Sequence, residues 1–299
     1  MNQVASDWKD YEVLDAGGKE KLERWNDIIL RRPDPVALWP IDDESNWKLA
    51  HAIYHRSNKG GGQWEFKTKI KDYWTISYKD LRFKISPTGF KHTGLFPEQA
   101  ANWDFIMNTI QNAKKENPNR QIRILNLFAY TGGATMAAAK AGADEVVHLD
   151  ASKGISAWAK ENMELNHLQN KKIRFLVDDV MKFLAREKRR GRTYDGIIMD
   201  PPSYGRGPNG EVWKLEDNIY DLLVEASELL SDQSLFFLVN LYTTGFPLTT
   251  LRQTLERTVA RKHKGFVEVG ETLLPITKGN SYLPCGSFGR WTSFDPQRD

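Results

Sequence analysis

Cysteine is almost missing from this chain of 299 residues, in which Cys285 is the single example. One cysteine excludes an internal disulfide and every zinc site built from several thiolates, and it is typical of a reducing compartment. Long apolar runs are missing too, since no stretch approaches the roughly 18 residues that a membrane helix needs. The first residues also lack the basic-then-apolar pattern of a secretory signal. We therefore expect a globular, cytoplasmic protein without a membrane partner.

A strong charge of either sign is missing as well, because the formal net charge is only +3. Such a weak surplus permits a nucleic-acid partner but does not require one. The densest basic cluster, residues 186–192, has two interpretations. It either contacts phosphates or is a solvated helix end whose cations offset the helix dipole, and we favour the second.

No convincing metal motif is present. His51 and His55 have the i, i+4 spacing that would place two imidazoles on one face of a helix, but no third ligand and no His-Glu-x-x-His pattern accompany them. We interpret both as structural histidines and expect no metal.

Residues 1–88 are predicted to form a β-rich N-terminal domain. Most of the tryptophans lie in the first 103 residues, glycine clusters at 17–18 and 60–62 indicate turns, and residues 72–78 and 81–85 have the aromatic and β-branched composition of strands. The aromatic residues either form the core of this domain or stack against RNA bases during substrate recognition.

Residues 89–299 are predicted to form a second domain with a doubly wound α/β sheet, because strands and helices alternate there. A linking helix is expected from Pro97 to Lys115. The two last strands lie close together in the sequence, which favours a C-terminal antiparallel hairpin. The expected strands are residues 122–128, 145–149, 173–177, 194–199, 235–240, 266–272 and 287–294, and the expected helices are 133–141, 155–165, 180–189, 218–230 and 248–259.

A glycine turn follows the first of these strands in the segment NLFAYTGGAT, residues 126–135. Gly132 and Gly133 allow the backbone to turn tightly and to approach a ligand. The Gly-x-Gly-x-x-Gly spacing of dinucleotide sites is absent, and bulky Phe128 and Tyr130 precede the glycines. This pattern predicts a cofactor without a diphosphate.

Acidic residues follow the next three strands. Asp150 in HLDAS is suited to ribose hydroxyls, Asp179 in LVDDV to the amino group of an adenine, and Asp200 comes directly after the fourth strand. The carboxyl ends of parallel strands meet at one edge of a sheet, so these carboxylates are expected to surround one pocket.

In this order, NLFAYTGGAT, HLDAS, LVDDV and IIMDPPSYG resemble the motifs of class I S-adenosylmethionine-dependent methyltransferases. The segments HTGLFPEQ (92–99) and KENMELN (160–166) are similar to the branch of large-subunit ribosomal RNA methyltransferases. The resemblance covers about residues 90–295 and implies a Rossmann-like, seven-stranded sheet that binds S-adenosylmethionine over the carboxyl ends of its strands. The cofactor-binding residues that we expect are Phe96, Gln99, Asn126, Phe128, Ala129, Tyr130, Thr131, Gly132, Gly133, Asp150, Ala151, Ser152, Asp179 and Asp200.

The segment DPPSYG is predicted to face the methyl acceptor. Pro201 and Pro202 form a stiff corner without N–H groups, so that carbonyl oxygens and the Asp200 carboxylate are available to an amino or amide nitrogen. Tyr204 offers a flat face to a planar base. The segment resembles the acidic-Pro-Pro-aromatic motif of amino-group methyltransferases, but Ser203 intervenes and leaves the acceptor atom open. The alternative is a plain strand terminator. We expect the catalytic residues to be Asp200, Pro201, Pro202 and Tyr204.

Cys285 is expected in the turn between the last two strands, at the ligand-binding end of the sheet. A thiolate there would allow addition to a pyrimidine ring before methylation at C5. The strand ends at 200–204 and 240–243 carry no cysteine, unlike those of RNA cytosine-C5 methyltransferases. We therefore favour an inert small side chain.

The sequence thus predicts an S-adenosylmethionine-dependent methyltransferase that acts on an RNA base, with ribosomal RNA as the partner. The alternatives are a protein or small-molecule acceptor, or a protein that binds the methyl donor without catalysis. An NAD-dependent oxidoreductase conflicts with the missing dinucleotide motif. The oligomeric state is left open.

Overall fold

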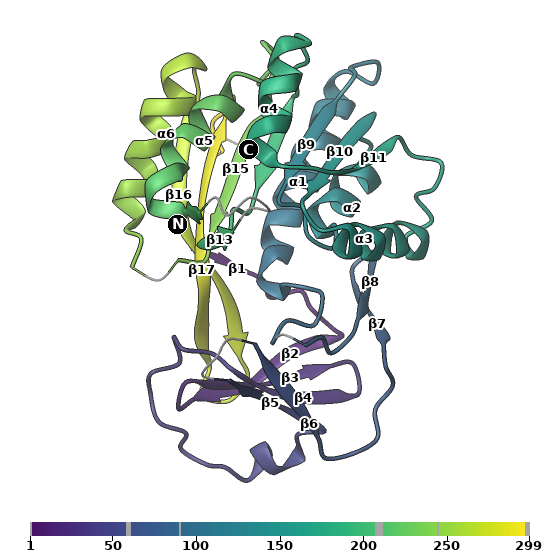
Figure 1. The fold of residues 1–299 in the computed structure, drawn as a ribbon, viewed down its shortest axis with the longest axis vertical. Coiled ribbons are helices and arrows are strands. Elements are labelled where there is room, and N and C mark those ends of the chain that lie inside the picture. The colour runs from purple at the N-terminus through teal and green to yellow at the C-terminus, as the bar shows by residue number, and fades with distance from the viewer. Residues whose placement is uncertain (1, 58–60, 90, 207–211, 244, 297–299) are drawn as a thin grey trace. The chain divides into compact units, whose positions relative to one another are not determined.

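The structure, a computed structural model, describes residues 2–57, 61–89, 91–206, 212–243 and 245–296. The chain divides into two compact units (Figure 1). The β-rich unit comprises Val4–Ala101 and Thr272–Cys285, and the α/β unit comprises Met1–Gln3, Asn102–Glu271 and Gly286–Asp299. A β-rich domain in the N-terminal part of the chain is thereby confirmed, whereas the boundary at residue 88 stays a prediction.

The β-rich unit contains a sheet with the order β2-β3-β4-β5-β6 and a separate β7–β8 hairpin. Its core is aromatic: Trp25, Tyr78 and Phe83 are fully buried. Tyr11 packs edge-on against Trp25, with 4.6 Å between the centres of the two rings. These residues therefore belong to the core. The strands are β2 (Tyr11–Gly17), β3 (Glu20–Trp25), β4 (Ile28–Pro33), β5 (Ala52–Arg56), β6 (Gly62–Phe66), β7 (Trp74–Tyr78) and β8 (Leu81–Ile85), with short 3-10 helices η1 (Asn46–Leu49) and η2 (Pro97–Gln99).

The α/β unit is built on the strand order β11-β10-β9-β12-β15-β17-β16, which confirms the predicted doubly wound sheet. The neighbours β11, β10, β9, β12 and β15 are parallel, and β17 pairs antiparallel with β15. The short β1 (Gln3–Val4) pairs with β16. The bounds are β9 (Arg123–Leu127), β10 (Glu145–Asp150), β11 (Ile173–Val177), β12 (Gly196–Met199), β15 (Phe236–Leu241), β16 (Phe266–Ile276) and β17 (Ser281–Thr292).

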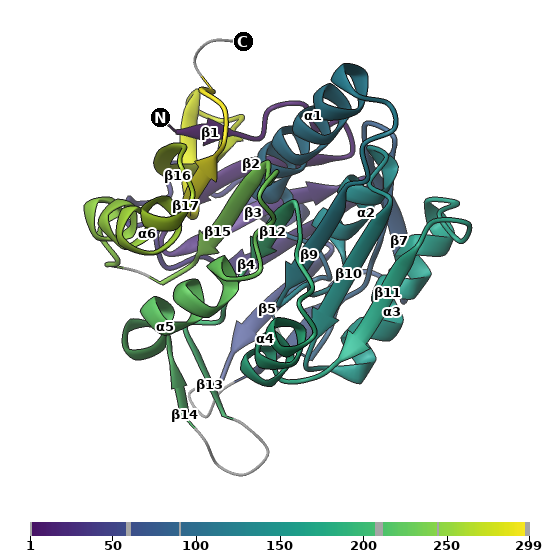
Figure 2. The same cartoon turned by 90° about the horizontal axis from the view of Figure 1, so that it is seen from above.

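Helices cover both faces of this sheet: α1, α2 and α3 lie on one face, and α4, α5 and α6 on the other (Figure 2). Because both faces are covered, the central strands are mostly apolar; every residue of β12 and β15 is buried, including the polar Asn240. The helices are α1 (Ala100–Glu116), α2 (Gly133–Lys140), α3 (Lys153–Leu165), α4 (Val180–Arg189), α5 (Leu215–Ser227) and α6 (Leu248–Lys262).

Several predicted elements need correction. A small hairpin, β13 (Tyr204–Arg206) with β14 (Val212–Lys214), follows the Pro-Pro corner, where no strand was predicted, and α5 begins at Leu215 rather than at residue 218. The last two strands are longer than predicted, so that their connection falls at residues 277–280. No helix in the described part of the chain has the length and apolar character needed to cross a membrane.

The two histidines do not lie on a helix, because His51 precedes strand β5 and His55 lies within it. His51 Nδ1 accepts a hydrogen bond from the Ile29 N–H at 2.9 Å, and His55 contacts Glu65. Both side chains thus have local partners, as the structural interpretation expects. Within the described ranges, no group of three or more metal-binding side chains is found.

Candidate cofactor and acceptor site

The turn after β9 has an unusual backbone. Phe128 and Tyr130 have φ values of 53° and 51°, and Gly132 follows at 86°. Bulky residues seldom adopt this left-handed region, and such strain persists only where the surroundings enforce it. Backbone hydrogen bonds do so here: the Ala129 N–H reaches the Leu149 carbonyl and the Gly132 N–H reaches the Ala129 carbonyl, each at 3.0 Å. The turn is therefore rigidly shaped, as a cofactor site requires.

Gly133, the first residue of α2, is required for packing. A Cβ atom at this position would lie 2.7 Å from the ring of Trp103, which occupies α1. The second glycine thus allows α2 to pack closely against α1, and the first provides the left-handed turn. Both glycines thus have structural roles in this turn, and neither role requires a diphosphate bound at the start of α2.

Asp150 ties the end of β10 to this turn. Its Oδ2 accepts a hydrogen bond from the Tyr130 N–H at 3.0 Å, and its Oδ1 accepts one from the Ser152 N–H at 2.8 Å. Burial raises the pKa of this carboxyl above its ordinary value, and the two backbone hydrogen bonds partly offset that effect. An ionised carboxylate accepts about four hydrogen bonds. Two acceptor positions therefore remain for the hydroxyls of a ribose, which fits a nucleoside-bearing cofactor.

The end of β11 also fits an adenine. Asp179 caps helix α4, because its Oδ1 accepts a hydrogen bond from the Lys182 N–H at 2.9 Å, and Oδ2 is the oxygen left over by this cap. Its neighbours Val177 and Met181 are 50% and 37% exposed, which is unusual for apolar side chains. This edge therefore offers both an apolar surface and a hydrogen-bond acceptor. The preceding Asp178 pairs instead with Arg186, and that contact lowers its pKa.

Asn126 lies below the turn in a buried polar network. Its Nδ2 donates to the Thr135 hydroxyl at 2.9 Å, and the same hydroxyl contacts His148 Nδ1 at 2.9 Å. His148 is completely buried, and burial lowers its pKa to about 3. Asn162 in turn donates to the Thr131 carbonyl. The Asn126 side chain thus supports the turn from inside, while its direct contact with a cofactor stays a prediction.

The remaining predicted cofactor residues are differently placed. Ala129 and Thr131 are buried within the turn, whereas Ala151 and Ser152 are exposed at the start of α3, where the Ser152 hydroxyl accepts a hydrogen bond from the Ile155 N–H. Phe96 and Gln99 belong to the β-rich unit, at η2. Their place beside the cofactor stays a prediction.

The Pro-Pro corner is held by a residue that the sequence interpretation missed. Trp213 in β14 donates its indole N–H to the Pro202 carbonyl at 2.6 Å, and its ring lies 6.1 Å from that of Phe128. The Pro202 carbonyl therefore already has a partner, which corrects the expectation that the corner leaves it for a ligand. Tyr204 is 53% exposed, so a large part of this residue is accessible to solvent. An isolated tryptophan just before an amphipathic helix was the available signal.

Cys285 does not lie in a turn. It lies within β17, in the β-rich unit, and its thiol contacts the Leu283 carbonyl at 3.4 Å. Burial raises the pKa of this thiol well above its ordinary value. A thiolate is the reactive form, so the environment disfavours a nucleophile. The expected position is thus wrong, because β16 and β17 extend further than their apolar pattern indicates.

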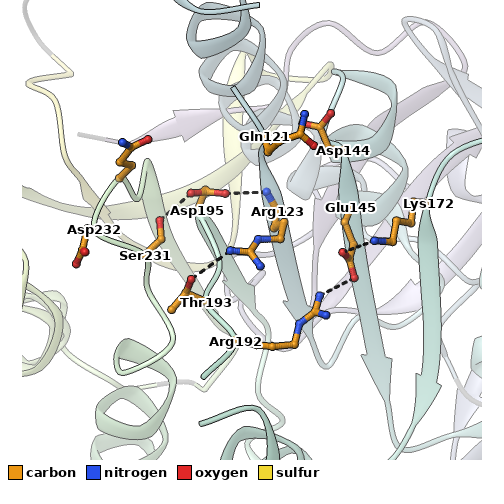
Figure 3. A pocket seen from close by; sticks show the side chains of 11 residues that line it. Gln121, Arg123, Asp144, Glu145, Lys172, Arg192, Thr193, Asp195, Ser231 and Asp232 are labelled. Carbon is orange, nitrogen blue, oxygen red and sulfur yellow. Dashed lines mark hydrogen bonds and ion pairs between the residues drawn. The ribbon is translucent and has the colours of Figure 1, made fainter. Parts of the chain in front are cut away.

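The opposite edge of the sheet carries a pocket of about 740 Å³ that contains none of the predicted site residues (Figure 3). It lies where the parallel strands begin, as Arg123 opens β9 and Glu145 opens β10. Cofactors of open parallel sheets bind at the carboxyl ends of the strands. We therefore do not assign the cofactor to this pocket. Its walls are Gln121, Arg123, Asp144, Glu145, Lys172, Arg192, Thr193, Asp195, Ser231, Asp232 and Gln233.

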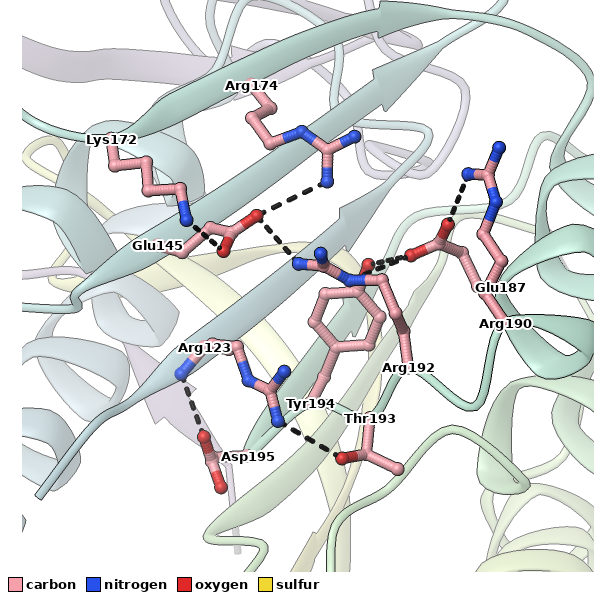
Figure 4. Close-up of polar contacts among 10 residues, drawn as sticks. All are labelled: Arg123, Glu145, Lys172, Arg174, Glu187, Arg190, Arg192, Thr193, Tyr194 and Asp195. Atoms are coloured by element: carbon pink, nitrogen blue, oxygen red, sulfur yellow. Dashed lines mark hydrogen bonds and ion pairs between the residues drawn. The ribbon is translucent and has the colours of Figure 1, made fainter.

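At this edge, where the parallel strands begin and which we call the amino edge, many charged side chains form ion pairs (Figure 4). Glu145 contacts Lys172, Arg174 and Arg192 at 2.8–3.3 Å. The nearby Glu187 contacts Arg190 and Arg192, and it accepts a hydrogen bond from the Tyr194 hydroxyl. Within the basic segment 186–192, Arg190 and Arg192 thus form ion pairs, a role that neither interpretation named, and the choice between a solvated helix end and phosphate contact stays a prediction.

A comparison with protein families decides the identity. The model of the family described as S-adenosylmethionine-dependent methyltransferase matches residues 19–257. The chain belongs to this family. Its methyl donor is S-adenosylmethionine, and the carboxyl edge of the sheet has the acceptors and apolar surface that the donor needs.

Relatives and solved structures agree with this identity. The methyltransferase is 30% identical over 209 residues to the ribosomal RNA large subunit methyltransferase K/L of Shewanella baltica strain OS195, covering 70% of this chain but only 27% of that protein. It therefore spans about a quarter of that relative's length. The crystal structure of the SAM-dependent methyltransferase from Agrobacterium tumefaciens is 36% identical, with a TM-score of 0.90 over 98% of this chain and 94% of that one.

A more distant neighbour shares the fold. The structure of SMU.776 in complex with SAH has a TM-score of 0.73 at 18% identity, covering 96% of this chain and 76% of that chain. The family assignment establishes the enzyme class and the donor, while the acceptor has to be inferred from the site.

Proposed function

We propose that this methyltransferase transfers the methyl group of S-adenosylmethionine to a base of RNA, and that the RNA is ribosomal. The observation that carries the proposal is the DPPSYG corner. It holds a carboxylate, Asp200, and an exposed aromatic residue, Tyr204, beside the cofactor turn, to which Trp213 links it. The name of the ribosomal RNA relative supports the choice of RNA.

When bound, the donor supplies an electrophilic methyl group on a sulfonium. Transfer is an in-line displacement, so that the enzyme mainly needs to align the acceptor atom with the methyl group. Asp150 and Asp179 would hold the nucleoside part of the donor, and the rigid turn at 128–133 would fix its position. Asp200 would accept the proton of an amino acceptor, and Tyr204 would stack on the base.

The β-rich unit would take part in substrate binding through exposed aromatic and basic side chains. Tyr73 and Phe66 are 57% and 55% exposed, and the Lys84 ammonium lies 4.9 Å from the centre of the Tyr73 ring. Exposed aromatic rings beside cations suit single-stranded RNA, because bases stack on the rings and phosphates attract the cations.

Comparison of methylated nucleosides in total RNA, by mass spectrometry, tests the proposal. Cells without the protein should lose one methylated nucleoside of the large ribosomal RNA. The purified enzyme should then restore it in RNA from these cells, with activity that falls steeply as salt increases. The weak charge of +3 keeps one alternative in view, a protein or small-molecule acceptor. Unchanged RNA together with methyl transfer to another cell fraction would establish that alternative.

A further inference from the structure

Arg290 in β17 is a buried cation with an unusual environment. It is 4% exposed, and its guanidinium lies 4.2 Å from the ring centre of Phe105 and 4.5 Å from that of Phe288. Burial lowers its pKa to about 10. Its Nη2 donates a hydrogen bond to Asn102 Oδ1 at 2.6 Å. A buried charge is costly to maintain, which indicates that this arginine has a role that an apolar residue could not fill.

This arginine fixes the direction of a chain of hydrogen bonds. A guanidinium only donates, so that the carbonyl oxygen of Asn102 must face Arg290. The amide nitrogen of Asn102 therefore faces away, and it donates to Asn240 Oδ1 at 2.8 Å. This contact orients Asn240 in turn: its Oδ1 faces Asn102, and its Nδ2 points away from the hydrogen-bonded series. Among the described residues, nothing accepts a hydrogen bond from this Nδ2 group.

Asn240 lies next to the predicted acceptor site. β12 and β15 are parallel, with Met199 paired to Val239, so the following residues, Asp200 and Asn240, are lateral neighbours on the same face. Beyond the strands, the two segments stay together, because the Thr243 hydroxyl donates to the Ser203 hydroxyl at 2.7 Å. Asn240 is 4% exposed at this carboxyl edge.

We propose that Asn240 is a specificity-determining residue, which presents a hydrogen-bond donor beside the Asp200 acceptor, and that Asn102 and Arg290 position it. The inference rests on the proposed function, in which Asp200 faces the acceptor base. A donor and an acceptor side by side bind an edge that carries the complementary pair: an N–H group next to a carbonyl oxygen or an unprotonated ring nitrogen. The substrate class is therefore a nucleobase bound through such an amide-like edge.

The substitution Asn102→Asp tests the direction of the chain. A carboxylate only accepts, so it keeps the contact with Arg290 but requires Asn240 to turn its Nδ2 inward and its oxygen outward. We expect kcat/KM for RNA from cells without the protein to fall about 10- to 100-fold. Affinity for S-adenosylhomocysteine and the thermal midpoint should not fall. Asn108→Asp, an exposed position on the same helix, is the matched control and should leave every value unchanged.

A second variant, Asn240→Asp, reaches the same outcome by another route, because its outward group is also an acceptor. It should show a comparable loss of kcat/KM with unchanged binding of S-adenosylhomocysteine. Full activity of both variants would overturn the proposal. Equal loss of activity and of thermal stability would also overturn it, since that result is expected of a purely structural network.

Nuclear magnetic resonance of the 15N-labelled protein gives a readout that needs no RNA. In the wild type, the Asn102 side-chain amide should exchange slowly with solvent and that of Asn240 faster; in Asn102→Asp, the Asn240 amide should become protected. Absence of this change would show that the direction is not set by Arg290. Failure of the proposed function would appear separately, as a wild-type enzyme that methylates no RNA while the exchange pattern is as expected.

Discussion

The carboxylates at the two edges of the parallel sheet in the α/β unit have different hydrogen-bond and ion-pair partners. At the amino edge, Glu145 and Glu187 contact arginine and lysine side chains, and these pairs link the start of β10 to β11 and to the segment just before β12. At the carboxyl edge, Asp150 accepts only backbone N–H groups among the described residues, and Asp179 caps a helix. A carboxylate whose partners are backbone groups keeps acceptor positions for a ligand. The chemistry of the two edges, rather than the size of their cavities, therefore distinguishes structure from function.

Among substitutions that test this difference between the two edges, we expect the largest loss of activity at Asp200. Asp200→Ala removes the carboxylate beside the acceptor, and kcat should fall by about 10² to 10⁴, the usual contribution of a general base. Affinity for S-adenosylhomocysteine, measured by calorimetry, should remain. A variant with normal turnover would mean that the corner only terminates β12.

Asp150 should have the next largest effect, on donor binding rather than on turnover. Asp150→Ala should weaken S-adenosylhomocysteine binding by about 100-fold, since it removes two acceptor positions and loosens the turn at Tyr130. Asp150→Asn, which keeps one carbonyl acceptor, should lose less. If both variants bind as tightly as the wild type in calorimetry, the donor lies elsewhere.

The amino edge should behave in the opposite way. Glu145→Gln leaves three cations without their carboxylate and should lower the free energy of unfolding by about 2 kcal/mol. Chemical denaturation measures this loss. The affinity of the folded variant for S-adenosylhomocysteine should not change. A weakened affinity would contradict the assignment of a structural role to the amino edge and of donor binding to the carboxyl edge.

His148 gives a pH-dependent test beneath the carboxyl edge. Its pKa is about 3 in the folded protein against an ordinary value of 6.5, so below pH 6.5 the unfolded chain binds a proton that the folded protein does not. Between pH 7.5 and 5, this residue should cost about 2 kcal/mol of unfolding free energy. The pH dependence of His148→Gln should be smaller by that amount. Parallel curves for the two proteins would contradict the expectation.

Trp213 should give the smallest effect. Trp213→Phe removes the hydrogen bond to the Pro202 carbonyl but keeps an aromatic ring near Phe128. The loss of about 1 kcal/mol should appear as a decrease of up to 10-fold in kcat/KM for the acceptor. Donor binding is the control and should stay constant. An unchanged kcat/KM would show that the corner is rigid without this contact.

Much of the α/β unit could be predicted because its strands are short apolar runs that end at a carboxylate or a glycine turn. The resemblance of four such ends to a known family added the donor. The hairpin at 204–214 could not be predicted, since its strands are three residues long and only partly buried. The hydrogen bonds that link Asn240 to Arg290 through Asn102 could not be predicted from the sequence either, because the three residues lie far apart in it and only the fold brings them together.

The return of Thr272–Cys285 to the β-rich unit determines how this protein can be divided. Ile276 pairs with Val13, and the Thr277 N–H donates to the Val13 carbonyl, so that a segment near the end of the chain completes a sheet begun near its start. A single cut cannot separate the units, and deletion of residues 1–88 would remove Val13, the partner of Ile276 and Thr277. Removal or exchange of either unit therefore requires cuts at more than one point of the chain.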